Sequence, residues 1–250
     1  MHYAILSDVH GNVEAFRAVV ADAEKRGVEK IVCLGDLVGF GPDPAACVDL
    51  AREKCGMILQ GCHDHALLEG AGHLPPPTRA TIDWAKEQLA ADPALADARL
   101  GTLREASTRY EAGGISFMHA SPHDPVHEYL FAEDVRRDPR KLARAFAGFE
   151  KIAFVGHTHT PGIFLENPIR WTGAAQLENY FHYKRGEKVI VNVGSVGLPR
   201  DGDARACYLE VSKNELYWRR IEYDLDGVVA KIEQNERLTR SVAERLRRGI

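Results

Sequence analysis

Short apolar runs alternate with stretches of helical periodicity over the first sixty residues. Residues 3–6, 30–34 and 57–59 each have the length and composition of a buried strand, and the apolar positions of 12–25 and 44–54 recur at helical spacing. This strand–helix–strand–helix–strand order predicts a parallel sheet with right-handed crossovers. Such a sheet brings the carboxyl ends of the three strands to one edge.

The rest of the chain predicts an α/β fold with a second sheet. Two glycines, Gly113 and Gly114, separate predicted strands at 108–112 and 115–118, which is typical of a hairpin. From residue 162 onward the pattern changes to short strands, and these predict a second sheet packed against the first. The remaining predicted elements are a helix at 78–91, a helix at 139–149, a strand at 152–155, short strands at 163–165, 189–191, 206–211 and 216–221, and a helical tail with a basic end at about 226–250.

The whole chain, 1–250, is predicted to form one domain, because it contains no internal repeat or linker and its composition is ordinary for a globular protein. A turn-rich break at 70–77 contains three consecutive prolines, which end any helix or sheet. We interpret the segment from about 70 to 106 either as a small cap over a site or as a surface insertion. The pattern does not favour one over the other.

Composition and charge exclude several classes of protein. No apolar run exceeds about four residues, and no signal-like segment follows Met1, so we expect neither a membrane span nor export, and a cytoplasmic location. A net charge of −4 argues against nucleic acid as a partner. The charge does not decide whether the protein forms an oligomer, which stays possible. The five cysteines are scattered without C-x-x-C pairs, which indicates reduced thiols; they are Cys33, Cys47, Cys55, Cys62 and Cys207.

Residues that can bind a metal follow most of the predicted strands. The first strand ends in Asp8 and His10, a carboxylate and an imidazole that suit a first-row divalent metal, although Asp8 is also placed to cap the following helix. In open α/β sheets, ligands bind at the carboxyl ends of the strands. The full set of such residues, with glycines beside most of them, is Asp8, His10, Asp36, His63, His119, His157 and His159.

These residues stand in motifs that resemble, in order, those of the calcineurin-like metallophosphoesterase superfamily. The motifs span residues 3–200 and are Asp8-Val9-His10, Gly35-Asp36, Gly61-Cys62-His63-Asp64, His119 and Gly156-His157-Thr158-His159. Two further stretches resemble the small bacterial and archaeal phosphodiesterase-like members: His119-Ala120-Ser121-Pro122, and Gly194-Ser195-Val196-Gly197 followed by Pro199-Arg200. The resemblance implies a two-sheet β-sandwich flanked by helices, of the α/β/β/α type.

The resemblance also implies a dinuclear metal site, in which two cations share a hydroxide for in-line attack on phosphorus. One metal would be bound by Asp8, His10 and His159, the other by His119 and His157, and Asp36 would bridge them.

Three further roles follow from the resemblance. His63 would contact the phosphoryl group or protonate the leaving oxygen, and Asp64 would orient the His63 ring. The alternative is that the two residues form only a structural contact. Arg200 is interpreted either as a phosphate clamp or as a surface ion pair. The loop containing Gly194 and Ser195 would bring main-chain N–H groups to the anion.

Cys62 departs from the family, in which the residue before His63 is normally an asparagine that binds the second metal. A thiolate would favour zinc or iron over magnesium and manganese, and it would cancel the positive charge that attracts phosphate. We distinguish three hypotheses: Cys62 is a ligand, it is a neutral bystander at a weakened second site, or it marks a protein with little catalysis.

The expected function is that of a metal-dependent phosphoesterase, a hydrolase that uses two transition-metal ions (iron, zinc or manganese). A phosphodiesterase acting on a small phosphoester or nucleotide is the leading hypothesis. Within the enzyme class the alternatives are a dinucleoside polyphosphate hydrolase and a phosphomonoesterase. The alternative from another class is a non-catalytic scaffold on the same fold, but such a protein has no need of His63 or of a bridging carboxylate.

Overall fold

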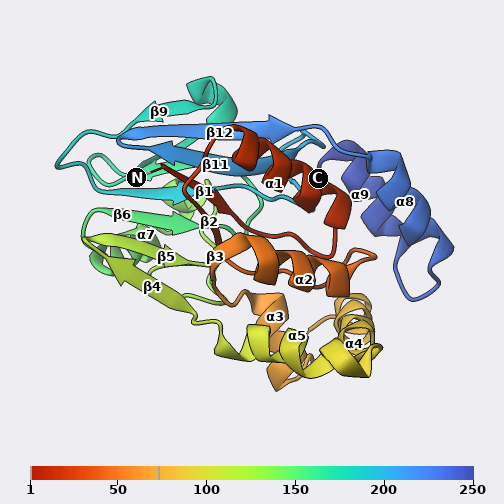
Figure 1. The fold of residues 1–250 in the computed structure, drawn as a ribbon. Helices are drawn as coiled ribbons and strands as arrows, with labels where there is room; N and C mark the ends of the chain where they lie inside the picture. Colours follow the sequence, from red (N-terminus) through yellow and green to blue (C-terminus); the bar gives the residue numbers. More distant parts are fainter. Residues whose placement is uncertain (1, 73) are drawn as a thin grey trace.

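Two six-stranded mixed sheets pack face to face in the computed structural model, which describes residues 2–72 and 74–250 (Figure 1). The first sheet has the order β3 (Cys55–Ile58), β2 (Lys30–Cys33), β1 (His2–Leu6), β11 (Ala206–Ser212), β12 (Glu215–Ile221) and β9 (Tyr180–His182). The second has the order β4 (Arg109–Ala112), β5 (Ile115–Met118), β6 (Ile152–Val155), β10 (Val189–Asn192), β7 (Gly162–Leu165) and β8 (Arg170–Gly173). The predicted sandwich of two sheets is confirmed.

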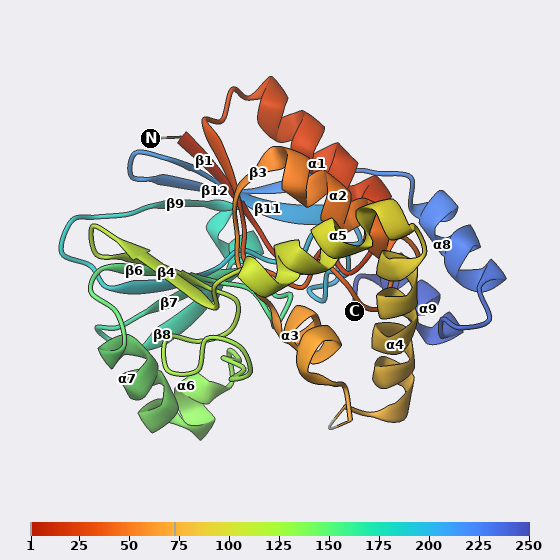
Figure 2. The same cartoon turned by 60° about the horizontal axis from the view of Figure 1, so that its bottom comes forward.

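Helices cover the outer face of each sheet (Figure 2). The first sheet is covered by α1 (Val13–Lys25) and α2 (Pro44–Lys54), and the second by α6 (Asp134–Arg137) and α7 (Pro139–Ala147). The other helices are α3 (Cys62–Glu69), α4 (Pro76–Ala90), α5 (Pro93–Glu105), α8 (Leu225–Gln234), α9 (Arg240–Arg248) and the short 3₁₀ helix η1 (Ala174–Leu177). The described part of the chain has no helix of a length and apolarity sufficient to span a membrane.

The central strands contain runs of buried apolar residues because both of their faces are covered. In β1, Ile5 faces the second sheet, whereas Ala4 and Leu6 face α1 and α2. In β6, Phe154 lies between the sheets and Ala153 faces α7. Side chains alternate across a strand, so a run without polar residues is the pattern of a doubly covered sheet.

The predicted division of strands between the sheets is wrong. We expected all strands after residue 162 to form the second sheet, but β11 and β12 extend the first sheet, where Ile5 of β1 faces Leu209 of β11 in an antiparallel pair. The second sheet instead begins with the hairpin β4–β5 and with β6. Hydrophobic periodicity reports which faces are buried and does not report which strand lies next to which.

Some predicted boundaries also differ from the structure. The third strand, Cys55–Ile58, begins two residues and ends one residue earlier than predicted, and the C-terminal tail forms two helices, α8 and α9. Helix α5, which the weak pattern after residue 91 did not predict, begins at Pro93 behind an Asp92 N-cap whose side chain accepts a hydrogen bond from Ala94 N at 3.0 Å.

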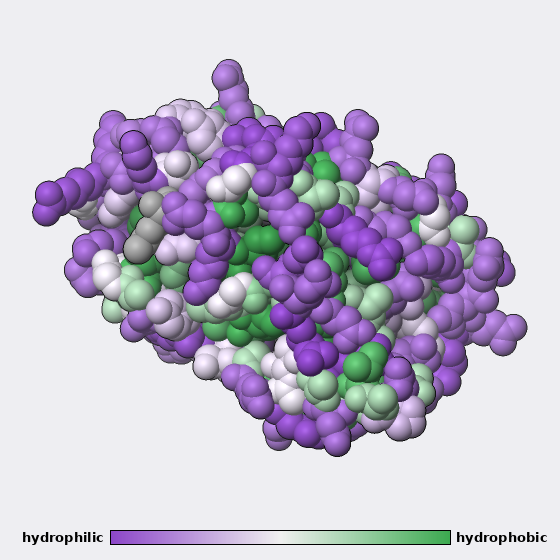
Figure 3. Space-filling view, in the orientation of Figure 1, coloured by the Kyte–Doolittle hydropathy of each residue, from purple (hydrophilic) through white to green (hydrophobic). Residues whose placement is uncertain are grey.

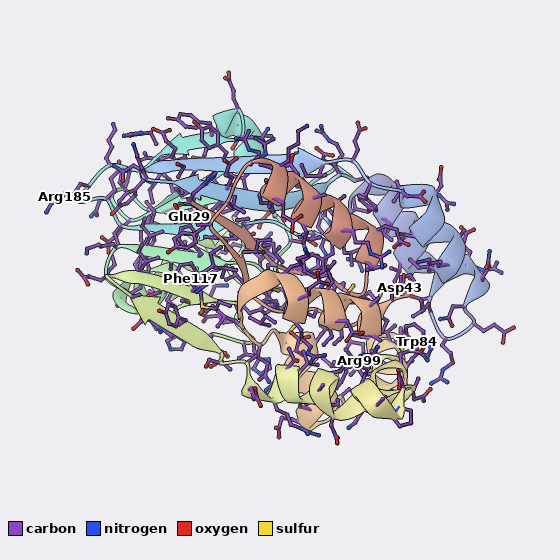
Figure 4. The ribbon with its side chains drawn as sticks, in the orientation of Figure 1. Glu29, Asp43, Trp84, Arg99, Phe117 and Arg185 are labelled. Carbon is purple, nitrogen blue, oxygen red and sulfur yellow. The ribbon has the colours of Figure 1, made fainter. Side chains whose placement is uncertain are left out.

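The segment that we interpreted as a cap or an insertion packs against the first half of the chain. Arg99 of α5 reaches Asp49 of α2, with Nε 3.0 Å from Oδ1 and Nη2 2.6 Å from Oδ2 (Figure 4). Trp84 of α4 belongs to an apolar cluster with Leu198 and with residues of α8 and α9. These contacts hold the segment beside the carboxyl ends of the strands of the first sheet. The role of the segment as a cap stays a prediction.

An apolar groove of about 340 Å³ lies at the opposite strand ends, between the free edges of the two sheets. Its lining includes Tyr3, Met57 and Phe117, and Figure 3 shows apolar side chains gathered on this face within a polar rim. Phe117 is labelled in Figure 4. The groove is therefore separate from the residues that the motifs single out.

Candidate metal centre

The predicted metal-binding residues converge where strands of both sheets end. Asp8 and His10 follow β1, and Asp36 follows β2, which pairs with β1 in parallel. From the other sheet, His119 follows β5, and His157 follows β6, which pairs with β5 in parallel. All of these side chains are buried. The two parallel pairs thus deliver carboxylates and imidazoles to one enclosed place.

The backbone at this place is strained. Nine non-glycine residues of the described chain have a left-handed backbone, and five of them are predicted metal ligands, with φ between 48° and 65°. This conformation costs an L-residue roughly 1–2 kcal/mol. The five residues are Asp8, His10, Asp36, His157 and His159. Strain concentrated at one set of polar residues is typical of a functional site.

A first group of donor atoms consists of Asp8, His10 and His159, which come within 4.8 Å of one another. The Nε2 of His159 lies 3.2 Å from Asp8 Oδ1 and 3.1 Å from the Nε2 of His10. Two imidazole nitrogens and a carboxylate oxygen around one point form a donor set that first-row divalent metals accept.

A second group consists of Asp36, Cys62, His119 and His157. His119 Nε2 lies 3.3 Å from Asp36 Oδ2 and 3.0 Å from His157 Nδ1, and Cys62 Sγ lies 3.4 Å from Asp36 Oδ2. Asp36 Oδ2 is also 3.7 Å from His10 Nε2 of the first group. Asp36 is therefore the residue that lies between the two groups.

Hydrogen bonds to main-chain carbonyls set the tautomers of three histidines. A carbonyl oxygen only accepts, so His10 must donate from Nδ1 to Val38 O at 3.1 Å, and His159 from Nδ1 to Leu198 O at 2.5 Å. His157 donates from Nε2 to the carbonyl oxygen of His127 at 3.2 Å. In each neutral ring the other nitrogen then turns a lone pair into the cluster. This arrangement is the one by which proteins orient metal-binding imidazoles, so the residues present could hold metal.

Burial and the two carboxylates determine the protonation of the cluster. Burial lowers the pKa of His10 well below its usual value and that of His157 to about 3, so both rings are neutral. Burial acts in the same direction on His119, but the carboxylates of Asp36 and Asp8 outweigh it and raise the pKa to about 9. Burial, reinforced by Asp36, raises the pKa of Cys62 well above that of a free thiol. The thiolate of Cys62 would thus need a cation beside it.

His63 lies at the edge of the cluster, on the first turn of α3. Its main-chain N–H donates to Asp36 Oδ1 at 2.7 Å, and its ring centroid lies 4.8 Å from that of His10 and 4.7 Å from that of Phe40. Among the described residues Nδ1 has no hydrogen-bond partner; it is buried and directed at Gly39, where a Cβ atom would come within 2.2 Å of it. The ring is held by packing, and Nε2 is left as its available nitrogen.

The carboxylate of Asp64 makes other contacts than the predicted one with His63. Its two carboxylate oxygens accept hydrogen bonds from four main-chain N–H groups, those of Asp36, Leu37, Val38 and Gly61, at 2.7–3.3 Å. Burial and the charge of Asp36 raise the pKa of Asp64 to about 7, while N–H donors such as those of Gly61 and Val38 oppose this rise. The carboxylate therefore holds the loop that carries Asp36 to the start of α3, and its oxygens do not orient the ring of His63.

The predicted substrate-binding residues separate into two kinds. Arg200 is half-buried, its main-chain N–H donates to His159 O at 3.2 Å, and its Nε has no hydrogen bond within the described chain. Ser195 is completely buried; its hydroxyl donates to Asp8 O at 2.8 Å and accepts from Leu198 N at 2.8 Å. Gly194 is buried beside it and donates its N–H to Asn192. The structure thus places Gly194 and Ser195 beneath Asp8, whereas Arg200 borders the cluster.

Three supporting residues were not predicted from the sequence. Asn192 donates from its side chain to Gly156 O at 2.7 Å and holds the turn that carries His157. Asn12, and not Asp8, caps α1 by accepting from Ala15 N at 3.0 Å. Tyr129 stacks on His157 with ring centroids 3.7 Å apart. A polar residue that ends an apolar strand, as Asn192 does, is a signal that the sequence contained.

Known proteins resemble this chain over its whole length. A protein of Methanocaldococcus jannaschii, described as uncharacterised, is 32% identical over 249 residues, which cover 97% of this chain and 96% of the relative. The crystal structure of a metallophosphoesterase from Sphaerobacter thermophilus superposes on this chain with a TM-score of 0.82. The two sequences are 31% identical, and the alignment covers 100% of both chains. A hypothetical protein from Pyrococcus horikoshii, 18% identical, covers 100% of this chain and 98% of its own, and shares the fold with a TM-score of 0.76.

The two-sheet sandwich and the cluster of carboxylates and imidazoles at its strand ends define a protein of the metallophosphoesterase class. The family model of the calcineurin-like phosphoesterase superfamily domain matches residues 1–214. The chain belongs to the calcineurin-like phosphoesterase superfamily.

Proposed function

We propose that this protein is a metal-dependent phosphoesterase and that its reaction is the hydrolysis of a phosphodiester. The observation that carries the proposal is the meeting of two donor groups at one carboxylate, Asp36. The histidines of both groups are neutral or paired with a carboxylate, and three of them are locked in the tautomer that faces the cluster. A scaffold would not require two such groups, so this arrangement favours catalysis.

The first metal would be held by Asp8, His10 and His159, and the second by His119, His157 and Cys62, with Asp36 shared between them. When bound, a pair of cations activates water and stabilises the negative charge that develops on phosphate oxygens. The protein fixes most of the ligands beforehand, because main-chain groups already hydrogen-bond the side chains of His10, His157, His159, Asp8 and Asp36. This preorganisation is what the strained backbone of the ligand residues would supply.

His63 would act on the substrate itself. Its Nε2 is free, and its ring is fixed between His10 and Phe40. A neutral imidazole that holds its proton at Nε2 can donate a hydrogen bond to a phosphoryl or leaving oxygen. Arg200 adds a guanidinium at the border of the cluster, which suits the other oxygens of the phosphate. A small phosphoester or a nucleotide would fit between these two side chains and the metals.

The test of the proposal is the metal content of the purified protein together with its hydrolysis of bis-p-nitrophenyl phosphate. We expect two metals per chain, turnover that returns when manganese, zinc or iron is added to stripped protein, and a loss of about 10²–10⁴-fold in kcat in His63→Ala. His123→Ala, which changes a histidine that is exposed, is the matched control and should retain full turnover. The absence of metals and of turnover with every ion would instead support a scaffold.

Replacing Cys62 with asparagine tests the first of the three hypotheses, that this residue is a metal ligand. If the thiolate is a ligand of the second site, Cys62→Asn should lower the affinity for zinc by about 10–100-fold and shift the preference toward manganese, because sulfur is replaced by a harder oxygen. Metal affinities measured by competition with chelators check this. Equal affinities in wild type and variant would show that Cys62 is a bystander.

A further inference from the structure

The loop that contains Phe40 holds an aromatic ring against two histidine rings of the site. The centroid of the Phe40 ring lies 5.0 Å from that of His10 and 4.7 Å from that of His63. Phe40 has a left-handed backbone, with a φ of 59°, which is rare for a bulky residue. The main-chain N–H of Gly41 donates to His10 O at 2.9 Å. A strained backbone persists only where the surrounding structure holds it, so other contacts of Phe40 have to support this position.

Phe40 packs against an apolar cluster that is formed mainly by the C-terminal helices, and we call it the C-terminal cluster. Helices α8 and α9 lie side by side at one end of the sandwich (Figure 1, Figure 2). Arg245 Cζ of α9 lies 5.9 Å from the centroid of the Phe40 ring, which places this helix beside it. The buried members of the cluster are Trp84, Leu198, Val228, Val229, Ile232, Leu238, Val242, Ala243 and Leu246. The cluster thus supports the ring that contacts His10 and His63.

Leu198 connects the same cluster to a second histidine of the first donor group. Its side chain is a buried member of the C-terminal cluster, and its carbonyl oxygen accepts from His159 Nδ1 at 2.5 Å. Two residues further along, Arg200 N donates to His159 O at 3.2 Å. The end of α9 is bonded to this loop, because Gly202 N donates to Gly249 O at 2.8 Å. The loop that orients His159 is therefore held by the C-terminal helices.

Both sets of contacts lead to the first donor group, because His10 and His159 are two of its three members. We propose that the C-terminal cluster positions this donor group and His63, with Phe40 and Leu198 as the positioning residues. The inference rests on the metal centre of the proposed function and does not depend on which ester is hydrolysed. Helices α8 and α9 lie beyond residues 1–214, the part that the family model matches. The chain thus orients part of its metal centre with helices outside the matched domain.

Zinc affinity, measured by competition with chelators, tests whether the cluster positions the ligands. Leu246→Ala opens a cavity in the cluster, so the affinity for one of the two zinc ions should fall about tenfold or more. Leu216→Ala is the matched control and should change the affinity by less than about twofold. Leu216 is equally buried, but it pairs with Val211, which pairs with Tyr3 at the end of β1 away from Asp8. Equal zinc affinities in the two variants would overturn the proposal.

Substitutions of Phe40 test the aromatic contact itself, and they decide the matter if circular dichroism shows that Leu246→Ala does not fold. Phe40→Ala removes the ring and should lower the zinc affinity about tenfold, whereas Phe40→Tyr keeps the ring and should bind zinc as the wild type does. A Phe40→Ala protein that is less stable but binds zinc with unchanged affinity would reduce Phe40 to a structural residue and contradict the proposal.

Hydrogen exchange tests the same coupling in the opposite direction. If α9 favours the metal-binding arrangement, bound metal must stabilise α9 by the same factor. Zinc added to the metal-free wild type should therefore slow the exchange of the α9 amides, and Phe40→Ala should weaken this effect. Exchange in wild-type α9 that zinc does not change would overturn the proposal, as would a wild type that binds no zinc. A wild type that binds zinc but hydrolyses no ester would refute the proposed function and leave these tests in force.

Discussion

Asp36→Asn should release metal from both donor groups and lower the turnover of bis-p-nitrophenyl phosphate by about a thousandfold or more. The reason is that Asp36 Oδ2 lies between His119 of one group and His10 of the other, at 3.3 and 3.7 Å. Asparagine keeps an oxygen that can accept from His63 N, so the start of α3 can stay in place, but the negative charge between the two sites is lost.

Metal content per chain and kcat, measured on the same preparation, check this expectation. Asp83→Asn, an exposed aspartate on α4, is the matched control and should behave as the wild type does. An Asp36→Asn protein that kept two metals and full turnover would remove Asp36 from its position as the shared ligand. A protein that lost metal but also unfolded would be recognised by its circular dichroism spectrum.

Asp64→Asn should destabilise the protein by about 2–6 kcal/mol, although Asp64 is not expected to touch metal or substrate. The carboxylate accepts from four main-chain N–H groups, two on each oxygen. An amide offers one acceptor oxygen and turns an NH₂ group toward two of these donors. Two buried N–H groups are then left unpaired, and each costs about 1–3 kcal/mol. Metal affinity should fall as well, because Val38, whose carbonyl orients His10, belongs to the same loop.

Urea denaturation of the metal-free protein measures the loss in the free energy of unfolding. Asp138→Asn is the matched control, since Asp138 caps α7 by accepting from a single N–H group, that of Lys141, at 3.0 Å. This control should change the free energy of unfolding by less than about 1 kcal/mol. A change of similar size in Asp64→Asn would contradict the role that we assign to its four hydrogen bonds.

The core of the fold could be predicted from the sequence because its strands are covered on both faces. Strands β1, β2 and β6 contain apolar runs of three or four residues, and such runs are visible without knowledge of their partners. Strands β8 and β9, which lie at the edges of their sheets and are partly exposed, carry no such pattern and were not predicted. Periodicity therefore reported burial well and pairing poorly.

The roles of site residues were predictable only as far as they depend on residue type. Carboxylates and imidazoles at strand ends indicated a metal site, and the motifs indicated a family. The hydrogen bonds that decide what each side chain does are long-range, so Asp64 and Ser195 were given roles that their contacts do not support.

The sequence by itself determined which residues can form this site. It indicated where the strands end, which side chains follow them, and the family to which the chain belongs. These are local properties, set by runs of apolar residues and by the side chains next to them. Only the tertiary structure decided which of these residues meet. His157 N donates to Asp8 Oδ2 at 3.0 Å although 149 positions separate them. Such contacts arise because two sheets bury their apolar faces against each other, which aligns the strand ends of both.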